Sequence, residues 1–270
     1  MIRARKRFGQ HFLHDPAVIA RIIAAVDLNS GDVAVEIGPG RGALTGGLLA
    51  AAGQLDAIEI DRDLAGQLRE RFAMLPQFVL HEADALQFDW RALAAQRGAR
   101  LRLIGNLPYN ISTPLLFRLL GCIDVITDMH FMLQREVAER ILAAPGTDAY
   151  GRLGVMLAPH LASTRVLDVG AGAFQPPPQV SSTVLRLVAR DAPPPPRLYG
   201  AIVAAAFAQR RKTLRNALRA YLSADEIAAL GLDPGVRAEQ LAPADFAALA
   251  HAVKPAAADA LAHSPDAVFH

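Results

Sequence analysis

Apolar runs of strand length alternate with helical spacing through the first two thirds of the chain. Four such runs, rich in β-branched residues, lie at 33–37, 55–60, 78–82 and 101–104. Between them, apolar residues recur three and four positions apart, which is the spacing of an amphipathic helix. Regular alternation of strand and helix predicts a parallel sheet of the α/β class. We expect 129–133 as a fifth strand, and 166–169 with 183–188 as a hairpin that closes the sheet.

Helical spacing continues outside these runs. Asp15 and Pro16 precede an apolar stripe at 18–26, and Asp as cap with Pro at the first helical position predicts a helix start. Residues 136–144 and 150–161 are also expected to be helical.

A run of four prolines at 193–196 separates the sheet from a stretch with helical spacing alone. We therefore predict two domains, a sheet domain over 1–192 with a basic amino-terminal arm and a small all-helical domain over 193–270. Residues from about 256 onward are alanine-rich with no core pattern, so no structure is predicted there.

Glycine or a polar residue ends each predicted strand. The first is followed by a turn with glycines at 38, 40 and 42, and the next three end at Glu59, Asp84 and Asn106. Because parallel strands present their carboxyl ends at one edge, these residues are expected to line one crevice, with the glycine turn as a nucleotide cradle. A dinucleotide-binding dehydrogenase is the rival, but its third glycine should fall one position later, and Asp84 and Asn106 would have no role.

The segment Asn106-Leu107-Pro108-Tyr109 follows the fourth strand directly. Proline cannot join a sheet ladder, so the strand should stop here and leave these residues at the sheet edge. An Asn side-chain oxygen and the carbonyl before a proline could accept hydrogen bonds from one amino group, while the Tyr ring offers a stacking face to a flat base. The alternative is a turn in which Asn and Pro only shape the backbone.

Composition narrows the class of protein. Apolar residues make up 52% of the chain, but no uninterrupted apolar run is long enough to span a bilayer, and the start lacks the apolar core of a secretory signal. The one cysteine, Cys122, excludes an internal disulfide, and no cluster of Cys and His has metal-binding spacing. A soluble, cytoplasmic protein without a metal is expected.

Positive charge is concentrated in two acid-free stretches. Residues 1–10 carry four cations and residues 192–224 carry six, although the net charge of the whole chain is only +2. The rest of the chain is therefore acidic, and basic islands on an acidic body suggest a polyanion bound at a defined face. The alternative is a solvated face with a basic arm that has no fixed structure.

Eight blocks in order carry a resemblance to a known family. They are RKRFGQHFLHD, VEIGPGRGALT, IEIDRDL, IGNLPYNISTPLLF, MHFMLQREVAERI, YGRLGVM, FQPPPQVSSTVLRL and FAQRRKTLRNAL, from residue 5 to about 220. The chain resembles the ribosomal RNA adenine dimethyltransferase family, and its bacterial members that dimethylate the N6 amines of two adjacent adenosines near the 3′ end of small-subunit (16S) ribosomal RNA. The resemblance implies a Rossmann-like class I S-adenosylmethionine-dependent methyltransferase sheet and a role in small-subunit biogenesis.

By this resemblance, individual residues acquire expected roles toward S-adenosylmethionine. They are His11 and Leu13 of the amino-terminal segment, Gly38 at the turn, Glu59 for the ribose hydroxyls, Asp84 for the adenine and Asn106 for the methionine end. The family commonly has Asn where this chain has His11. A neutral His can also donate one hydrogen bond, so the contact should survive, although His could add a pH dependence that Asn lacks.

The same resemblance implies how the target base is held. Asn106 and the carbonyl of Leu107 or Pro108 would accept hydrogen bonds from the adenine amine, with little need for a strong base. Tyr109 would stack on the extruded base and Phe174 would close its other face.

The predicted partner is small-subunit ribosomal RNA or its precursor particle, met by a monomer. The cations expected to bind it are Arg5, Lys6, Arg7, Arg210, Arg211, Lys212 and Arg215. Two alternatives stay open at this point: a macrolide-resistance type methyltransferase acting on large-subunit RNA, and an RNA-binding assembly factor whose methylation is dispensable. An intact set of cofactor residues favours an enzyme over a pure binder.

Overall fold

The computed structural model describes residues 11–209 and 211–254. Contacts divide the chain into two compact units, one formed by 1–138 with 162–189 and the other by 139–161 with 190–270. We describe each unit separately.

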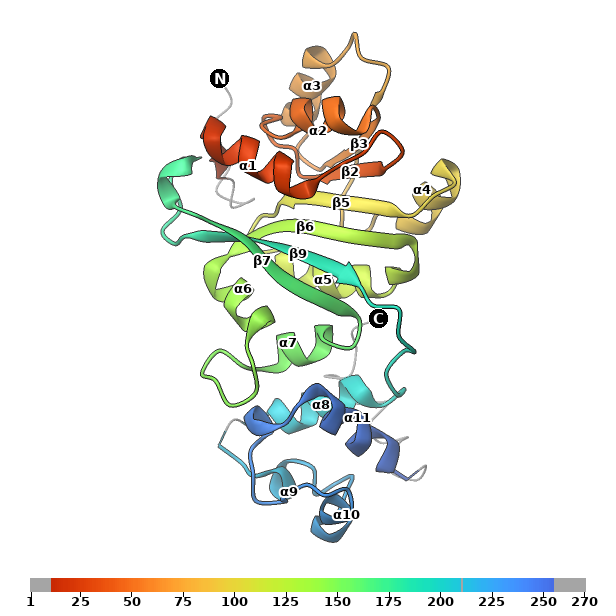
Figure 1. Cartoon of the computed structure of the whole chain (residues 1–270), viewed down its shortest axis with the longest axis vertical. Coiled ribbons are helices and arrows are strands. Elements are labelled where there is room, and N and C mark those ends of the chain that lie inside the picture. Colours follow the sequence, from red (N-terminus) through yellow and green to blue (C-terminus); the bar gives the residue numbers. More distant parts are fainter. Residues whose placement is uncertain (1–10, 210, 255–270) are drawn as a thin grey trace. The chain divides into compact units, whose positions relative to one another are not determined.

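The first unit is built on a sheet. Seven strands of the described chain pair in the order β4-β3-β2-β5-β6-β9-β7 (Figure 1). Their bounds are β2 (Val33–Ile37), β3 (Leu55–Glu59), β4 (Phe78–Glu82), β5 (Leu101–Asn106), β6 (Ile126–Gln134), β7 (Leu161–Val169) and β9 (Ser182–Ala189). Five neighbouring strands, β4, β3, β2, β5 and β6, are parallel to one another. β9 runs antiparallel to β6. The predicted α/β sheet is confirmed.

The chain enters this sheet at its middle. From β2 it adds β3 and β4 on one side, then returns to add β5 and β6 on the other. The order reverses between β2 and β5, and their loops leave in opposite directions there, which opens a crevice at the carboxyl ends of these strands.

Helices lie between the strands, as the spacing predicts. They are α1 (Pro16–Val26), α2 (Thr45–Ala52), α3 (Arg62–Arg71), α4 (Trp90–Arg97) and α5 (Ser112–Leu120), with 3₁₀ turns η2 (Ile123–Val125) and η3 (Ala171–Ala173), and then α6 (Arg135–Leu142). The predicted cap is present, because the Asp15 carboxylate accepts hydrogen bonds from the backbone of Ala17 and Val18. Helices α3 and α4 begin in the same way at Asp61 and Asp89.

A second, two-stranded sheet attaches the amino-terminal segment to the unit. β1 (Phe12–Leu13) pairs antiparallel with β8 (Phe174–Gln175), with Leu13 opposite Phe174. Leu13 is 6% and Phe174 is 3% exposed, and both belong to one core cluster with residues of α1 and α2. Burial of this pair fixes where the residue before β1 lies.

The second unit is helical. It contains α7 (Arg152–Leu157), α8 (Tyr199–Phe207), α9 (Leu214–Ala217), α10 (Ala224–Ala229), η4 (Ala238–Gln240) and α11 (Pro243–Ala252). Two buried tyrosines hold it together: Tyr150 donates its hydroxyl to the Leu241 carbonyl at 2.7 Å, and Tyr199 donates to Val155 at 2.8 Å. No helix in the described ranges is long and apolar enough to cross a membrane.

Two expectations differ from the structure. The segment 139–161 was expected in the sheet domain, but it belongs to the helical unit, because Tyr150 and Val155 are buried in the core of that unit. The helix expected over 150–161 is shorter, and residue 161 already begins β7, which is longer than the expected strand at 166–169.

Candidate functional site

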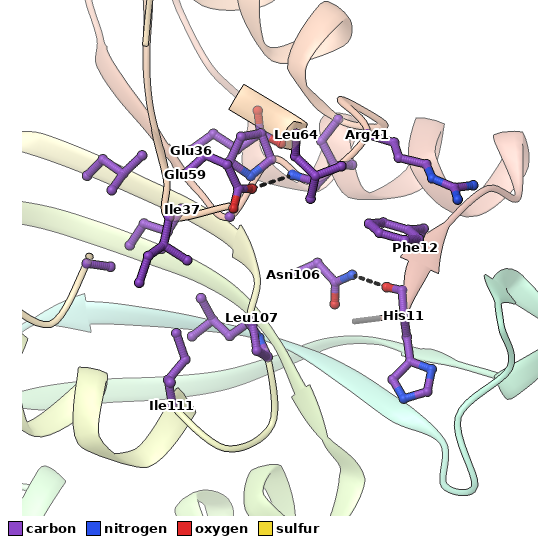
Figure 2. Close-up of a pocket in the computed structure, with 18 of the residues that line it drawn as sticks. His11, Phe12, Glu36, Ile37, Arg41, Glu59, Leu64, Asn106, Leu107 and Ile111 are labelled. Carbon is purple, nitrogen blue, oxygen red and sulfur yellow. Dashed lines mark hydrogen bonds between the residues drawn. The ribbon is translucent and has the colours of Figure 1, made fainter. Parts of the chain in front are cut away.

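A cavity of about 320 Å³ opens at the carboxyl edge of the sheet, at the switch between β2 and β5. Its walls come from β1, the glycine turn after β2, the ends of β3 and β4, and the segment that follows β5 (Figure 2). Its volume falls within the range of about 300–1,000 Å³ typical of small-molecule sites. The expected residues His11, Leu13, Gly38, Glu59, Asp84 and Asn106 all line it, as do Leu107, Pro108 and Tyr109.

The glycine turn forms the wall after β2. Gly38 and Gly40 have φ values of 65° and 58°, a left-handed conformation that favours glycine. The Gly38 amide donates to the Ile58 carbonyl at 2.9 Å, which ties the turn to β3. A Cβ at Gly40 would lie 3.3 Å from the Phe12 ring, so glycine also lets the turn approach β1 closely.

Glu59 ends β3 with its carboxylate facing this turn. One oxygen accepts from the Gly40 amide at 3.1 Å and the other from the Asp61 amide at 2.9 Å. The residue is 5% exposed, and burial raises the pKa of its carboxyl, with the nearby Asp61 charge acting in the same direction and these backbone bonds opposing it. A carboxylate has about four acceptor positions, so the fixed Glu59 side chain can still accept from a hydroxyl group of a bound ligand.

Asp84 lies in the turn after β4. Its Oδ1 accepts a hydrogen bond from the Leu86 amide at 2.9 Å, which fixes the side chain against the wall of the cavity. A carboxylate in this place can accept from a donor on a bound ligand through its second oxygen.

Asn106 ends β5 and faces the amino-terminal segment. Its Nδ2 donates to the backbone carbonyl of His11 at 3.1 Å (Figure 2). A carbonyl can only accept, so this contact fixes which end of the amide is nitrogen and leaves Oδ1 as the acceptor on the other side. The amide is therefore oriented as an acceptor before any ligand binds.

The segment after Asn106 is held by its own contacts. Leu107 is 1% exposed, and its amide donates to the Met132 carbonyl at 3.2 Å. The Pro108 carbonyl already accepts from the Ile111 amide at 3.1 Å, so one of its lone pairs is in use. The expected backbone acceptor next to Asn106 must therefore be the Leu107 carbonyl or the second lone pair of Pro108.

Tyr109 is anchored at both ends. Its hydroxyl lies 3.1 Å from the Ser182 hydroxyl of β9, and its carbonyl accepts from the Ser112 hydroxyl at 3.1 Å. Its ring stacks on the imidazole of His11, with ring centroids 5.7 Å apart and an interplanar angle of 30°. Nδ1 of His11 donates to the Pro176 carbonyl at 2.8 Å.

Phe174 lies in β8, next to the segment that lines the cavity. It is 3% exposed, packs in the core cluster opposite Leu13, and is absent from the residues that line the cavity. Its ring makes core contacts in this structure, and the expectation that it closes the second face of a bound base stays a prediction.

Glu36 is a cavity residue that the sequence reasoning missed. It sits inside β2, is 2% exposed, and accepts a 2.6 Å hydrogen bond from the Thr45 hydroxyl. Burial raises the pKa of its carboxyl to about 7, opposed by the Thr45 bond and reinforced by the charge of Glu59. The sequence does carry a sign of this residue, because Glu36 is a carboxylate within an apolar run that is expected to be buried on both faces of the sheet.

The predicted RNA-binding cations divide into two groups. Arg211, Lys212 and Arg215 are exposed beside and on α9 of the helical unit. Arg5, Lys6, Arg7 and Arg210 lie outside the described residues. Within the described ranges, no group of three or more His, Cys, Asp or Glu side chains is arranged to hold a metal ion.

Comparison with known families and proteins gives the family of this chain. The family described as "Ribosomal RNA adenine dimethylase" matches residues 1–254. The chain belongs to this family. The family predicted from the eight sequence blocks is confirmed, and so is the predicted class of activity. The chain is a ribosomal RNA adenine dimethyltransferase.

Relatives and solved structures support the membership of the family. "Ribosomal RNA small subunit methyltransferase A" of Methylococcus capsulatus is 52% identical over 254 residues, covering 93% of this chain and 98% of that protein. The protein of the same name from Pseudomonas aeruginosa is 51% identical, covering 92% and 94%.

Among solved structures, a dimethyladenosine transferase from Plasmodium falciparum superposes with a TM-score of 0.74 at 25% identity, covering 88% of this chain and 96% of that one. The 23S rRNA methyltransferase ErmE gives 0.69 at 27%, covering 90% and 99%. The predicted methyltransferase fold class is thereby confirmed.

Titration of Glu36 should give the adenine dimethyltransferase a distinctive stability profile. Below pH 4.5 the carboxyl is protonated in both the folded and the unfolded chain. As the pH rises from 4.5, the ordinary value, through about 7, the unfolded chain ionises first, so the free energy of unfolding should fall by about 3 kcal/mol from this group. Glu36→Gln stays neutral and can still accept from Thr45, so it should lose this slope.

Urea unfolding of both proteins at pH 5 and pH 8 measures the difference. The free energy of unfolding of Glu36→Gln minus that of the native chain should increase between pH 5 and pH 8. Glu82→Gln, which alters an exposed acid at the end of β4, is the control and should show no such increase. Equal pH dependence in the native chain and Glu36→Gln would contradict a buried neutral carboxyl.

Proposed function

We propose that the protein dimethylates the N6 amines of two adjacent adenosines near the 3′ end of small-subunit (16S) ribosomal RNA, with S-adenosylmethionine as methyl donor, on small-subunit particles in the cytoplasm. The observation that carries the proposal is the Asn106 amide, fixed by the His11 carbonyl so that its oxygen faces a cavity of nucleoside size. The relatives at 52% and 51% identity, which are named as small-subunit enzymes, support the choice of RNA.

The residues of the cavity fit the chemistry of this cofactor. The Glu59 carboxylate suits a ribose diol, and Asp84 suits the amino group of an adenine. The glycine turn allows close backbone approach, and the Glu36 and Asn106 ends of the cavity offer oxygen acceptors to a methionine ammonium. When bound, the cofactor supplies a methyl group on a sulfonium sulfur, which is electrophilic.

Asn106 and the neighbouring carbonyl would then control the nucleophile. The lone pair of an adenine amine is delocalised into the ring, and two hydrogen bonds accepted from its protons favour a geometry in which that pair turns out of the ring plane. The new N–C bond forms as the C–S bond breaks. The methylated nitrogen is a cation on an aromatic ring and strongly acidic, so it can release its proton to water, and positioning replaces a strong base.

The helical unit is proposed to contact the RNA backbone. Arg211, Lys212 and Arg215 are exposed there and carry no acid between them in sequence. Phosphate contacts of this kind position a protein without reading sequence. We propose that this unit and the arm with Arg5, Lys6 and Arg7 bind the RNA backbone of the small-subunit particle. The target adenosines would then be held at the cavity.

A large-subunit RNA methyltransferase is the second candidate, supported by the superposition on a 23S rRNA enzyme at 27% identity. Methyl transfer from labelled S-adenosylmethionine to unmethylated small-subunit particles, large-subunit RNA and duplex DNA tests the choice. Incorporation is expected with the particles alone. Preference for large-subunit RNA would overturn the proposed substrate, and no transfer to any RNA would favour a binding factor.

Asn106→Ala removes the oriented acceptor. Turnover on small-subunit particles should fall by about 10²-fold or more, because a preorganised polar contact to the reacting amine is lost. RNA binding should change little. Single-turnover methylation with saturating cofactor measures this, and turnover equal to that of the native chain would rule out the proposed role of Asn106.

Glu59→Gln and Asp84→Asn test the cofactor assignment. Each should weaken S-adenosylmethionine binding by about 1.5–3 kcal/mol, the size of a hydrogen bond to a charged group. Calorimetry with the full chain gives the affinities. Glu82→Gln is the control, because Glu82 ends β4 but is not among the residues that line the cavity. Unchanged affinity in both variants would show that the ligand lies elsewhere.

Arg211→Gln with Lys212→Gln tests the RNA surface. Affinity for small-subunit RNA should fall for every sequence, and the slope of log affinity against log salt should decrease by about 0.7–0.9 per lost phosphate contact. Arg237→Gln with Lys254→Gln removes the same charge from the same unit and serves as the control. A salt slope equal to that of the native chain would leave Arg211 and Lys212 as ordinary surface charge.

A further inference from the structure

Ser182 is a buried polar residue at the edge of the sheet where the cavity opens. It is the first residue of β9 and pairs with Gln134, the last residue of β6. Because β6 runs parallel to β5, its carboxyl end lies at the same edge as Asn106. The register of these three strands therefore brings Ser182 to the segment that follows β5.

The Ser182 hydroxyl has one side-chain partner among the residues that the structure describes. Its Oγ lies 3.1 Å from the hydroxyl of Tyr109, which is 73 positions away in the chain. Ser182 is 0% exposed. A hydroxyl buried without a partner is costly, and an apolar side chain would fill this place in β9 without that cost. The contact with Tyr109 accounts for a hydroxyl at this position.

This contact fixes the Tyr109 side chain at its far end. At the near end, the Tyr109 carbonyl accepts from the Ser112 hydroxyl at 3.1 Å, which holds the backbone. A change of χ1 from one staggered position to another would carry the ring away from its place and break the contact with Ser182. Because both ends are held, the ring is kept in one rotamer.

The backbone beside this ring carries one of the acceptors proposed for the adenine amine. The peptide group between Pro108 and Tyr109 is planar, so a shift of Tyr109 also turns the Pro108 carbonyl. That carbonyl accepts from the Ile111 amide at 3.1 Å, and its second lone pair is free for a ligand. The orientation of the ring and that of the carbonyl therefore depend on the same contact.

We propose that Ser182 is a positioning residue for methyl transfer: its hydroxyl holds the Tyr109 ring, and with it the Pro108 carbonyl, in the orientation that the target adenine needs. This rests on the proposed function. Ser182 is not among the residues that line the cavity, so it acts through Tyr109 and touches neither the base nor the cofactor. It should affect the rate of transfer and leave the affinity for the cofactor unchanged.

A double-variant cycle in the full chain tests this coupling. Ser182→Ala removes one hydroxyl of the pair, Tyr109→Phe removes the other and keeps the ring, and the double variant removes both. Thr183→Val is the matched control, because Thr183 is also 0% exposed in β9 but its hydroxyl donates to Asp168 at 2.6 Å. The readouts are the single-turnover rate on unmethylated small-subunit particles at saturating cofactor, and the Kd of S-adenosylhomocysteine by calorimetry.

Ser182→Ala should lower the single-turnover rate by about 2- to 12-fold, the factor expected for the loss of one neutral hydrogen bond. Tyr109→Phe should lower the rate by a similar factor. The double variant should be no slower than the slower single variant, because the same contact is lost in all three. Thr183→Val should transfer methyl groups at the native rate, and the Kd of S-adenosylhomocysteine should be the same in every protein.

Three results would overturn the proposal. A native rate in Ser182→Ala would show that the hydroxyl has no role in methyl transfer. Losses that multiply in the double variant would show that Ser182 does not act through Tyr109. An equal loss in Thr183→Val would show that the rate follows the integrity of β9 and not this contact.

Folding and the proposed function are tested separately. Thermal unfolding of each variant identifies a folding defect, and where Ser182→Ala is unstable, Tyr109→Phe still removes the contact from the other side. A native chain that transfers methyl groups to no RNA would refute the proposed function, and the role of Ser182 with it. An active native chain with an equally active Ser182→Ala would refute the role of Ser182 alone.

Discussion

The hydrogen bond from the Asn106 side chain to the His11 carbonyl joins residues 95 positions apart, and the geometry of the site depends on it. Asn106 is placed by β5, whose register with β2 and β6 fixes the end of the strand. His11 is placed by the pairing of β1 with β8 and by the burial of Leu13. Neither segment alone orients the amide. The acceptor that we propose for the adenine amine is oriented only because both segments reach the same point.

Close packing at the strand switch supports this contact. Gly105 precedes Asn106, and a Cβ there would lie 2.8 Å from the Ile37 carbonyl, so only glycine lets β5 run this near the end of β2. The Glu59 carboxylate ties the glycine turn to the end of β3 in the same region. The cavity is therefore bounded by backbone and by side chains with fixed partners, which is the preorganisation that methyl transfer by positioning requires.

Much of this arrangement follows from the sequence because it rests on local patterns. Apolar runs define the strands, and parallel strands place Glu59, Asp84 and Asn106 along one edge whatever the details of packing. The rest depends on contacts between distant segments. Phe174 goes into the core because β8 pairs with β1, more than 160 residues earlier, and residues 139–161 join the helical unit because Tyr150 finds an acceptor at Leu241. No local pattern encodes either pairing.

The role of the Asn106 amide can be tested by measuring one distance in a complex with RNA. A structure of the full chain on small-subunit particles, with S-adenosylhomocysteine in place of the methyl donor, would locate the target adenine. We expect its N6 within hydrogen-bond distance, about 2.7–3.2 Å, of Oδ1 of Asn106, with Nδ2 still donating to the His11 carbonyl. An amine held by other groups, with Oδ1 turned away or beyond about 4 Å, would contradict it.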